Sequence, residues 1–421
     1  MSKRVATDGG ASLLGIVVRS AVASGLVTLL YGTGSLSGIQ ATWADAFERI
    51  FRPTASPRVA VVAITDADYA SGDLFGGISP LDPGALKRLL ERLAAHRPAA
   101  VAVDILLQPP PYESRERQAS RRELYATLEK LAHDKGTRWI LVEPEDAQPP
   151  SNDTLTAAAW DQLRHLPTQD AGQLTWASAQ LTAEDGLVRH IALCTQLRGD
   201  AAPIPTVLGA LINVADQSVH CTPRPNPPSV VQRIRYTGAF SLGARNARAG
   251  RIFSAGDILA PANPPHDDTI LTGRVIIVGG TFSAGSDKHW TPVGTLYGAE
   301  VWAEAFDSWW RQDALYEPPW PLVFLLQTAI GVASGWLTLR LTMFWGYAAA
   351  ILGMGALTVL FAWISFGGGF IVASSLPSFF AAQMNVQFGS LPGLLADWVQ
   401  GRVERRRRAT RIKRRERRDE D

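Results

Sequence analysis

The sequence predicts a three-layer α/β domain with a mainly parallel sheet, together with about four transmembrane α-helices. Two observations carry this prediction. Short apolar runs alternate with amphipathic stretches between residues 58 and 143, and long apolar segments lie near the N-terminus and after residue 318. With 421 residues, the chain is long enough to form both a folded domain and a membrane part.

The first strand–helix–strand unit is predicted between residues 58 and 105. RVAVVAI (58–64) is a short apolar run typical of a buried strand, and LDPGALKRLLERLAAHRP (81–98) has leucines at helical spacing. Asp82 is a suitable N-cap, with Pro83 at the first helical position. AAVAVDI (99–105) is the next strand, so we expect a parallel pair joined by a right-handed crossover.

Three further elements extend this pattern: a helix over 120–134, a strand over 137–143 and a late strand over 273–281. The strands are apolar throughout instead of alternating. Such strands are buried on both faces, as in sheets covered by helices on two sides. A three-layer α/β arrangement follows from this pattern.

Four segments have the length and composition of membrane spans. Each contains close to the roughly 20 residues that a helix needs to cross a bilayer. We prefer a retained anchor to a cleaved signal peptide for the first, because it is long and no clear A-x-A site ends it. The predicted spans are 12–36, 319–341, 344–366 and 368–389.

The basic residues near these spans predict their orientation. MSKR at the N-terminus, Arg340 between the second and third spans, and the Arg-rich tail all indicate the cytoplasmic side. Residues 1–11 and 390–421 would then be cytoplasmic, and 40–316 would form an extracytoplasmic domain. In a bacterial cell this is a multi-pass inner-membrane protein with a large periplasmic domain.

Three aspartates follow or end predicted strands: Asp66, Asp104 and Asp287. Polar groups that bind ligands collect at the carboxyl ends of the strands in open parallel sheets. If these strands are neighbours, the three carboxylates converge at one edge. The alternative, left open by spacing alone, is that each aspartate caps its own helix or turn.

The two cysteines, Cys194 and Cys221, form neither a CxxC motif nor a Cys/His cluster, so a zinc site is not expected. They could pair as a disulfide if their region lies outside the cytoplasm. A Ca²⁺ or Mg²⁺ site would need several acidic side chains to converge, and we predict neither a metal nor a cofactor.

The segment VGGTFSAGS (278–286) resembles a glycine-rich phosphate loop but lacks GxxxxGK[ST], and we interpret it as a glycine turn after a buried strand. Ser283 or Ser286 with a histidine and an aspartate could mimic a hydrolase triad, but no G-x-S-x-G elbow is present. We therefore do not expect an enzyme.

Taken in order, several stretches resemble the CHASE domain of the second type, a sensory extracellular domain associated with cyclases and histidine kinases. They are VAVVAITDADYA (59–70), LERLAAHRPAAVAVDILL (90–107), DGLVRHIALC (185–194), IRYTGAF (234–240), GDILAP (256–261) and the long run from 272 to 310. The resemblance covers most of residues 45–315, and three closing membrane spans also fit it.

This resemblance implies an extracytoplasmic sensor for an unknown ligand. Its recurrent acidic positions correspond to Asp66, Asp104 and Asp287, and its TP turn to Thr291 and Pro292, so we take Asp66, Asp104, Asp287 and Thr291 as candidate ligand-binding residues. Such proteins usually continue into a kinase or cyclase after the last span, whereas about thirty residues follow it here. A separate cytoplasmic partner is therefore expected to supply the output.

The tail over 390–421 has an apolar helical face that includes Trp398, followed by the run Arg405, Arg406, Arg407 and Arg408. One interpretation is a topology signal that contacts anionic lipid; the other is a helix that docks or dimerises with an effector. Nucleic-acid binding is not expected, because no fold or aromatic pattern supports it.

These observations favour a membrane sensor that acts as a homodimer and signals through its helices. The alternatives are a membrane scaffold with a degenerate sensor domain and, less favoured, an extracytoplasmic hydrolase. Residues 303–321, which join the domain to the second span, would pass the signal.

Overall fold

The computed structural model describes most of the region between residues 52 and 312. The continuous stretches are 52–134, 136–144, 153–166, 173–183, 185–196, 203–215, 231–241, 251–260, 270–285 and 287–312, with isolated positions elsewhere. Contacts divide the chain into two units, and the one over residues 48–315 contains the α/β domain. Most of the four predicted spans and all of the basic tail lie outside the described residues. No helix within the described positions combines the length and the hydropathy that a bilayer span requires.

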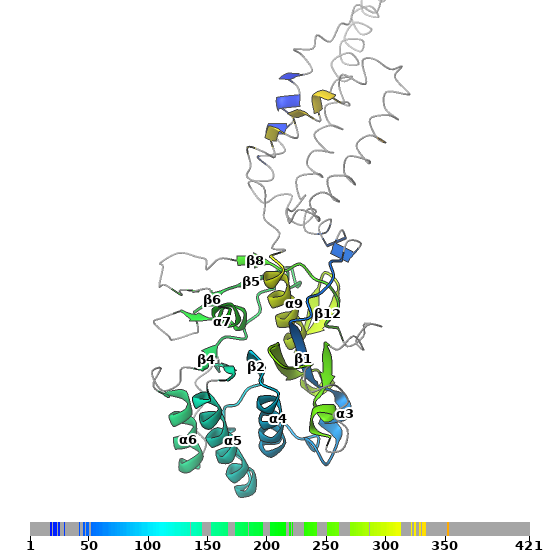
Figure 1. The fold of residues 1–421 in the computed structure, drawn as a ribbon. Helices are drawn as coiled ribbons and strands as arrows, with labels where there is room; N and C mark the ends of the chain where they lie inside the picture. Colours follow the sequence, from blue (N-terminus) through cyan, green and yellow to red (C-terminus); the bar gives the residue numbers. More distant parts are fainter. Residues whose placement is uncertain are drawn as a thin grey trace, which may run out of the picture. The chain divides into compact units, whose positions relative to one another are not determined.

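A six-stranded parallel sheet forms the centre of this unit (Figure 1). Its strand order is β4-β3-β2-β10-β1-β9, and every neighbouring pair is parallel. The strands are β1 (Val59–Ile64), β2 (Ala100–Asp104), β3 (Arg138–Val142), β4 (Leu174–Ala177), β9 (Ile252–Ser254) and β10 (Val275–Gly280). The mainly parallel sheet predicted from the sequence is confirmed.

The expectation that β1 and β2 are neighbours is wrong, because β10 lies between them. β10 reads VIIVGG, and its first five residues are buried. A strand whose side chains are apolar on both faces buries the most apolar surface in the middle of the sheet, where helices cover both faces. The local sequence of residues 58–105 does not indicate that a strand from much later in the chain lies between β1 and β2.

The helices of the α/β domain are α3 (Asp66–Ala70), α4 (Pro83–Ala95), α5 (Arg115–His133), α6 (Thr154–Arg164), α7 (Val207–Val214), α8 (Ala255–Leu259) and α9 (Gly298–Trp310). The two helices predicted from the sequence, over 81–98 and 120–134, are present as α4 and α5, and five further helices were not predicted. Asp82 caps α4 as predicted, because its carboxylate accepts the Ala85 N–H at 2.7 Å. The predicted helix 120–134 begins five residues earlier, since Ser114 caps α5.

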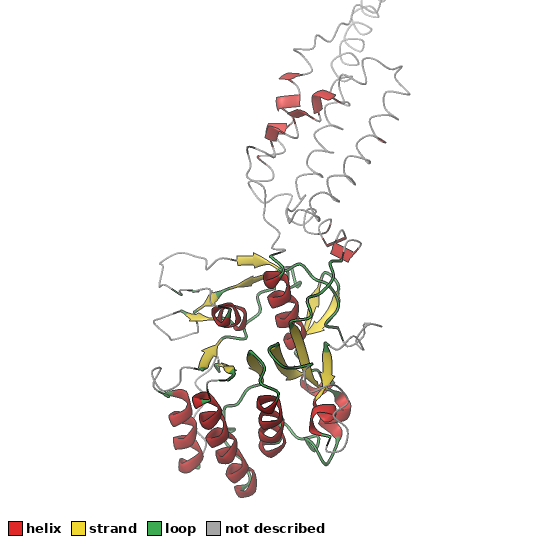
Figure 2. Cartoon of the chain, in the orientation of Figure 1, coloured by secondary structure: helices red, strands yellow, loops and turns green. Residues whose placement is uncertain are grey.

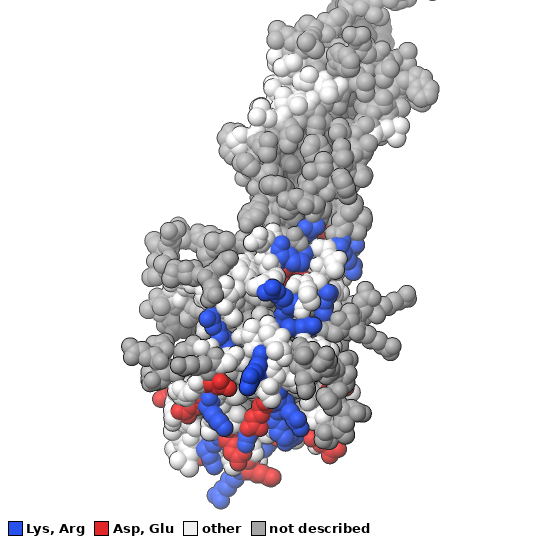
Figure 3. All heavy atoms as spheres, viewed as in Figure 1, with Lys and Arg blue, Asp and Glu red and all other residues white. Residues whose placement is uncertain are grey.

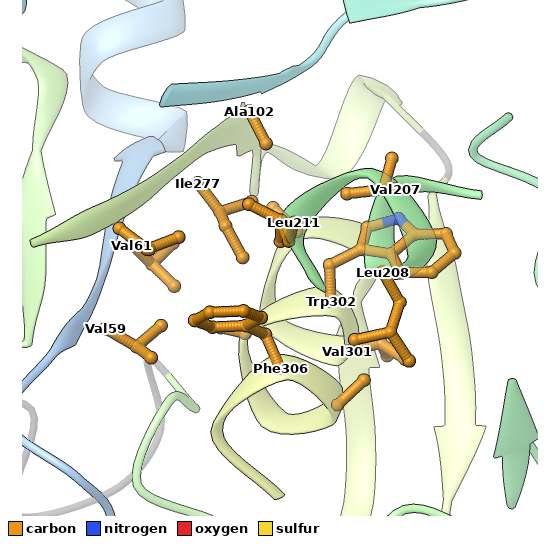
Figure 4. Close-up of a cluster of buried hydrophobic side chains, with 14 of the residues drawn as sticks. Val59, Val61, Ala102, Val207, Leu208, Leu211, Ile277, Val301, Trp302 and Phe306 are labelled. Atoms are coloured by element: carbon orange, nitrogen blue, oxygen red, sulfur yellow. The ribbon is translucent and has the colours of Figure 1, made fainter. Parts of the chain in front are cut away.

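Two apolar cores, one on each face of the sheet, confirm the three layers. On one face, Ala60, Val62 and Ile64 of β1 pack with the leucines of α4 and with α5. On the other face, Val59, Val61 and Ala63 pack with α7 and α9 (Figure 4). Trp302 and Phe306 of α9 are fully buried there. Each such side chain stabilises the fold by roughly 1.5–3 kcal/mol.

Three small antiparallel ladders flank the main sheet (Figure 2). They pair β5 (His190–Ala192) with β8 (Val231–Arg233), β6 (Cys194–Thr195) with β7 (Ile204–Pro205), and β11 (Lys288–Thr291) with β12 (Gly294–Tyr297). Cys194 of β6 is joined to Cys221 by a disulfide, with their Cα atoms 5.7 Å apart. The hairpin of β11 and β12 leads directly into α9, which positions the candidate site.

Candidate functional site

The carboxyl end of β2 carries Asp104, whose strand partner is Gly279 of β10. β2 continues toward α5, which covers one face of the sheet, whereas the chain after β10 continues to α9 on the other face. In parallel sheets, ligands usually bind at the carboxyl edge where connections leave neighbouring strands on opposite faces, and we call this edge between β2 and β10 the crevice. Asp104 lies at this crevice and is partly buried.

Asp287 lies at the same place, on the loop between β10 and β11. The backbone N–H of Gly298, the first residue of α9, donates to Asp287 Oδ2 at 3.1 Å. The His289 ring forms a second contact, with Nε2 at 2.8 Å from Asp287 Oδ1. The positive end of the helix dipole stabilises a carboxylate in this position. Asp287 thus caps α9, as the alternative interpretation of the sequence allowed.

The carboxylates of Asp104 and Asp287 meet across Gly298. A Cβ atom on this glycine would lie 2.1 Å from Asp287 Oδ2 and 3.1 Å from Asp104 Oδ2. A second glycine brings the helix this close to the sheet, because a Cβ on Gly279 would lie 2.4 Å from the Ala299 Cβ. The two glycines therefore create the space in which the two acids face each other.

The protonation of Asp104 reflects this setting. Burial raises the pKa of its carboxyl to about 8, and the nearby charge of Asp287 adds to the rise. At neutral pH, Asp104 is therefore mostly a neutral acid that can donate a hydrogen bond, beside the solvent-exposed Asp287. A ligand with a positive charge would favour ionisation of Asp104, so its binding would release a proton.

Asp66 does not join this pair directly. Its carboxylate accepts the backbone N–H of Ser283 at 2.7 Å and the Ser283 hydroxyl at 3.2 Å. It therefore fixes the loop that follows β10 from the end of β1. Among the described residues, no three acidic, histidine or cysteine side chains are grouped as a metal site would require. The predicted convergence of three carboxylates is thus reduced to a pair, with the third holding the same loop.

Thr291 has a structural position in the hairpin. It is buried, and its hydroxyl donates to the Gly294 carbonyl at 2.5 Å across the turn between β11 and β12. Trp398 and Arg405–Arg408 lie outside the described residues. The interpretation of VGGTFSAGS as a glycine turn after a buried strand is correct for Gly285, which lies in a 3-10 turn over Ser283–Gly285, but not for the first two glycines. Gly279 and Gly280 belong to β10, and they are small because α9 and Phe282 approach the strand closely.

Comparison with protein-family models gives one match, the CHASE2 domain, over residues 22–350. The chain belongs to the CHASE2 domain family. This is a family of extracellular sensory domains, so the resemblance found in the sequence is confirmed. Comparisons with curated proteins and with solved structures found no match.

A row of buried polar residues on α9 of this CHASE2 domain was not anticipated from the sequence. Glu304 accepts the Thr237 N–H at 2.6 Å and the Thr237 hydroxyl at 2.9 Å. Asp307 accepts the Ser56 N–H at 2.7 Å and the Arg311 Nε–H at 2.8 Å. We call Glu300, Glu304, Asp307 and Ser308 the polar seam of α9.

The seam joins α9 to two segments that are distant in the sequence. Ser308 adds a third link, since its hydroxyl accepts the Arg235 N–H at 3.0 Å. Residues 52–56 and 235–240 are thereby held against the carboxyl half of the helix. Burial raises the pKa of Glu304 to about 7, although the hydrogen bonds from Thr237 act in the opposite direction. Burial also raises the pKa of Asp307.

Spacing alone could have indicated this seam. Residues 300, 304, 307 and 308 recur at the i, i+4, i+7 and i+8 positions of one helical face. The rest of the helix is apolar, with Val301, Trp302 and Phe306 in the core. Acidic residues on a helix that is buried all round require hydrogen-bond partners inside the protein. The segment IRYTGAF supplies most of these partners.

Proposed function

We propose that this CHASE2 protein is a membrane-anchored sensor whose extracytoplasmic domain binds its ligand at the crevice beside Asp104 and Asp287. The observation that carries the proposal is the pair of carboxylates facing each other across the first residue of α9. The ligand would present a positive charge or a hydrogen-bond donor. It would act on α9 directly, because Asp287 is bonded to the start of that helix.

α9 is suited to pass on the effect of binding. Thirteen residues at about 1.5 Å each give a helix of roughly 20 Å. The ligand crevice lies at its first residue, and Trp309 and Trp310 lie at its last turn, shortly before the span predicted from Pro319. The polar seam fixes residues 52–56 and 235–240 to the helix, so a shift of α9 would move them together.

The disulfide supports an extracytoplasmic place for the domain. Disulfides persist in oxidising compartments and are rare in the cytosol of mesophiles. The bond between Cys194 and Cys221 agrees with the orientation predicted from the basic residues. The remaining parts of the proposal are the four spans, a homodimer, and a separate signalling enzyme that reads the cytoplasmic tail.

The experiment is stimulus-dependent capture of that partner. The full chain would be purified by affinity from cells grown with and without candidate stimuli, and the captured proteins compared. Asp104→Asn should abolish the dependence on the stimulus and leave membrane insertion unchanged. Asp161→Asn is a matched control, since Asp161 is exposed on α6 and far in sequence from the crevice. Unaltered stimulus dependence in the Asp104→Asn protein would refute the proposal.

A chain that lacks residues 401–421 separates this proposal from a scaffold. For a sensor, removal of the basic tail should end capture of the signalling enzyme in every condition. For a scaffold, the full chain would hold the same structural proteins whether or not a stimulus is present. The hydrolase alternative gains no support from Ser283, whose hydroxyl donates to Asp66 and not to a histidine.

A further inference from the structure

The carboxyl end of α9 is surrounded by arginines. Arg58 lies over the Trp310 ring, with its guanidinium carbon 4.6 Å from the ring centroid. Arg311 follows the helix and donates to the Arg235 carbonyl at 3.2 Å, and Arg251 donates to the Ala55 carbonyl at 2.6 Å. Arg52 lies against Gly238, in the segment that is bonded to α9, and Arg49 donates to the Pro292 carbonyl at 2.7 Å in the hairpin that leads into α9. We call the following set the arginine collar: Arg49, Arg52, Arg58, Arg251 and Arg311.

Three members of the collar present charge that no acidic side chain neutralises. Arg49, Arg52 and Arg58 are exposed, and no carboxylate within the described part of the chain forms an ion pair with them. The nearby acids are buried and already bound: Glu48 pairs with Arg233, and Asp307 pairs with Arg311. Among the described residues, the exposed charges at this end are therefore mainly positive.

This charge contrasts with the rest of the unit. Residues 48–315 contain 26 Lys and Arg against 30 Asp and Glu, a net charge of −4. In the view of Figure 3, acidic and basic side chains are mixed over the end of the unit that contains α4 and α5. The opposite end, where α9 finishes, shows mainly basic side chains among the described residues. In this view the excess of basic side chains is thus confined to the end where α9 finishes.

Chain connectivity relates this end to the predicted membrane. Eight residues separate Trp310 from Pro319, where the second span is predicted to begin. A fully extended chain of this length reaches at most roughly 30 Å. The collar is thus tethered close to the surface from which that span would emerge. Its two partly exposed tryptophans, Trp309 and Trp310, are the residue type that prefers the membrane–water interface.

We infer that the arginine collar and its two tryptophans bind the head groups of anionic phospholipids on the outer surface of the membrane. The guanidinium groups match phosphate in charge and geometry, and the indole rings suit the head-group layer. The basic charge does not conflict with an outward orientation, because large domains are translocated regardless of their charge. The inference rests on the proposed membrane anchoring and adds a lipid class to it.

Lipid contact at this place would act on the sensor's output. The collar is built on the same segments that the polar seam attaches to α9, since Ser56 bonds to Asp307 and Arg235 bonds to Ser308. Docking of residues 49–58 on the bilayer would therefore hold the carboxyl end of α9 at a fixed depth. A displacement of α9 that begins at Gly298 would then be passed to the second predicted span, because the domain could not tilt on the membrane instead.

The test is hydrogen exchange of the full chain in nanodiscs. One set contains phosphatidylcholine alone, and the other contains phosphatidylcholine with phosphatidylglycerol. Amides of residues 52–58 and 305–311 should exchange more slowly with the anionic lipid, by about fivefold for each arginine that contacts it, the factor that corresponds to about 1 kcal/mol. Salt at about 1 M, where the Debye length is about 3 Å, should remove the difference.

Matched variants decide the outcome. The triple change Arg49→Gln, Arg52→Gln and Arg58→Gln should abolish the effect of phosphatidylglycerol. Arg92→Gln, Arg115→Gln and Lys130→Gln remove the same charge from exposed positions on α4 and α5 and should preserve it. Unchanged exchange of residues 299–304 in both triple variants checks that the fold is retained.

Two failures are distinguishable. Equal exchange in the two lipid compositions, or an effect that the Arg49, Arg52 and Arg58 substitutions leave intact, overturns the lipid inference and leaves the proposed sensor in place. A chain that does not co-elute with nanodiscs of either composition contradicts the membrane anchoring of the proposed function, and the lipid inference falls with it.

Discussion

Replacing Glu304 by glutamine should remove a large part of the pH dependence of the domain's stability between pH 4.5 and 7. Glu304 is fully buried, and burial raises its pKa from 4.5 to about 7. In the unfolded chain the same group ionises near pH 4.5. The folded state thus binds the proton more tightly, and folding becomes less favourable as the pH rises through this range.

The magnitude follows from the shift. A rise of about 2.5 pKa units at 1.36 kcal/mol each gives roughly 3 kcal/mol of stability, present below pH 4.5 and lost above pH 7. Glutamine has no charge to bury, so its variant should keep that stability at pH 8. It gives up part of the bonding to Thr237 and Phe240, at a cost of about 1 kcal/mol. The variant should therefore be more stable than the native protein by about 2 kcal/mol at pH 8.

Urea unfolding of the full chain in non-ionic detergent, followed by near-ultraviolet circular dichroism, measures this difference at pH 4.5, 6, 7 and 8. Asp104 and Asp307 also have raised pKa values, so the native slope with pH will exceed the Glu304 contribution, and the relevant quantity is the difference between the two proteins. Glu91→Gln, an exposed site on α4, is the control and should follow the native curve. If the free energies of unfolding of the native protein and of Glu304→Gln changed equally with pH, the reasoning would be refuted.

Two more predictions concern the disulfide and the crevice. Replacing both Cys194 and Cys221 by serine opens a loop of 27 residues and should lower the free energy of unfolding by about 3–4 kcal/mol. The urea midpoint of the variant should therefore be lower than that of the oxidised native protein, and an unchanged midpoint would contradict the prediction. Gly298→Ala places a methyl group where Asp287 Oδ2 lies, so the exposed side chain of Asp287 should move away from Asp104. The pKa of Asp104 should then fall. Because burial is the larger cause of its raised pKa, the fall should be less than half of the total rise. Infrared titration of the protonated carboxyl band, with Asp104→Asn as the reference, measures this fall. An unchanged titration midpoint would show that Asp287 has no influence on the pKa of Asp104.

Four strands and two helices of the domain follow from the sequence because their signals are local. Apolar runs of five or six residues marked β1, β2, β3 and β10, and Asp82 with Pro83 marked the start of α4. The order of the strands did not follow. β10 enters between β1 and β2 after a separation of about 170 residues, and nothing in the local pattern of either strand specifies that neighbour.

The candidate site was predicted in part for a similar reason. The carboxyl-edge rule brought Asp104 and Asp287 to one place, because it depends only on where parallel strands end. Their approach from the two sides of Gly298 depends on α9, which comes close only because Gly279 and Gly298 lack side chains. The separate role of Asp66 depends on the loop conformation at Ser283, which the strand pattern does not contain.

The polar seam of α9 is better explained by positioning than by stability. Buried carboxylates with raised pKa values make folding less favourable at neutral pH, and apolar residues of similar size would avoid that cost. Apolar contacts, however, are non-directional and would let the helix settle in neighbouring registers against the sheet. Hydrogen bonds from Ser56, Thr237 and Arg235 each fix one position of α9 along its axis. The helix whose first residue lies at the proposed ligand site therefore has one defined register at its carboxyl end, as the proposed signalling by displacement requires.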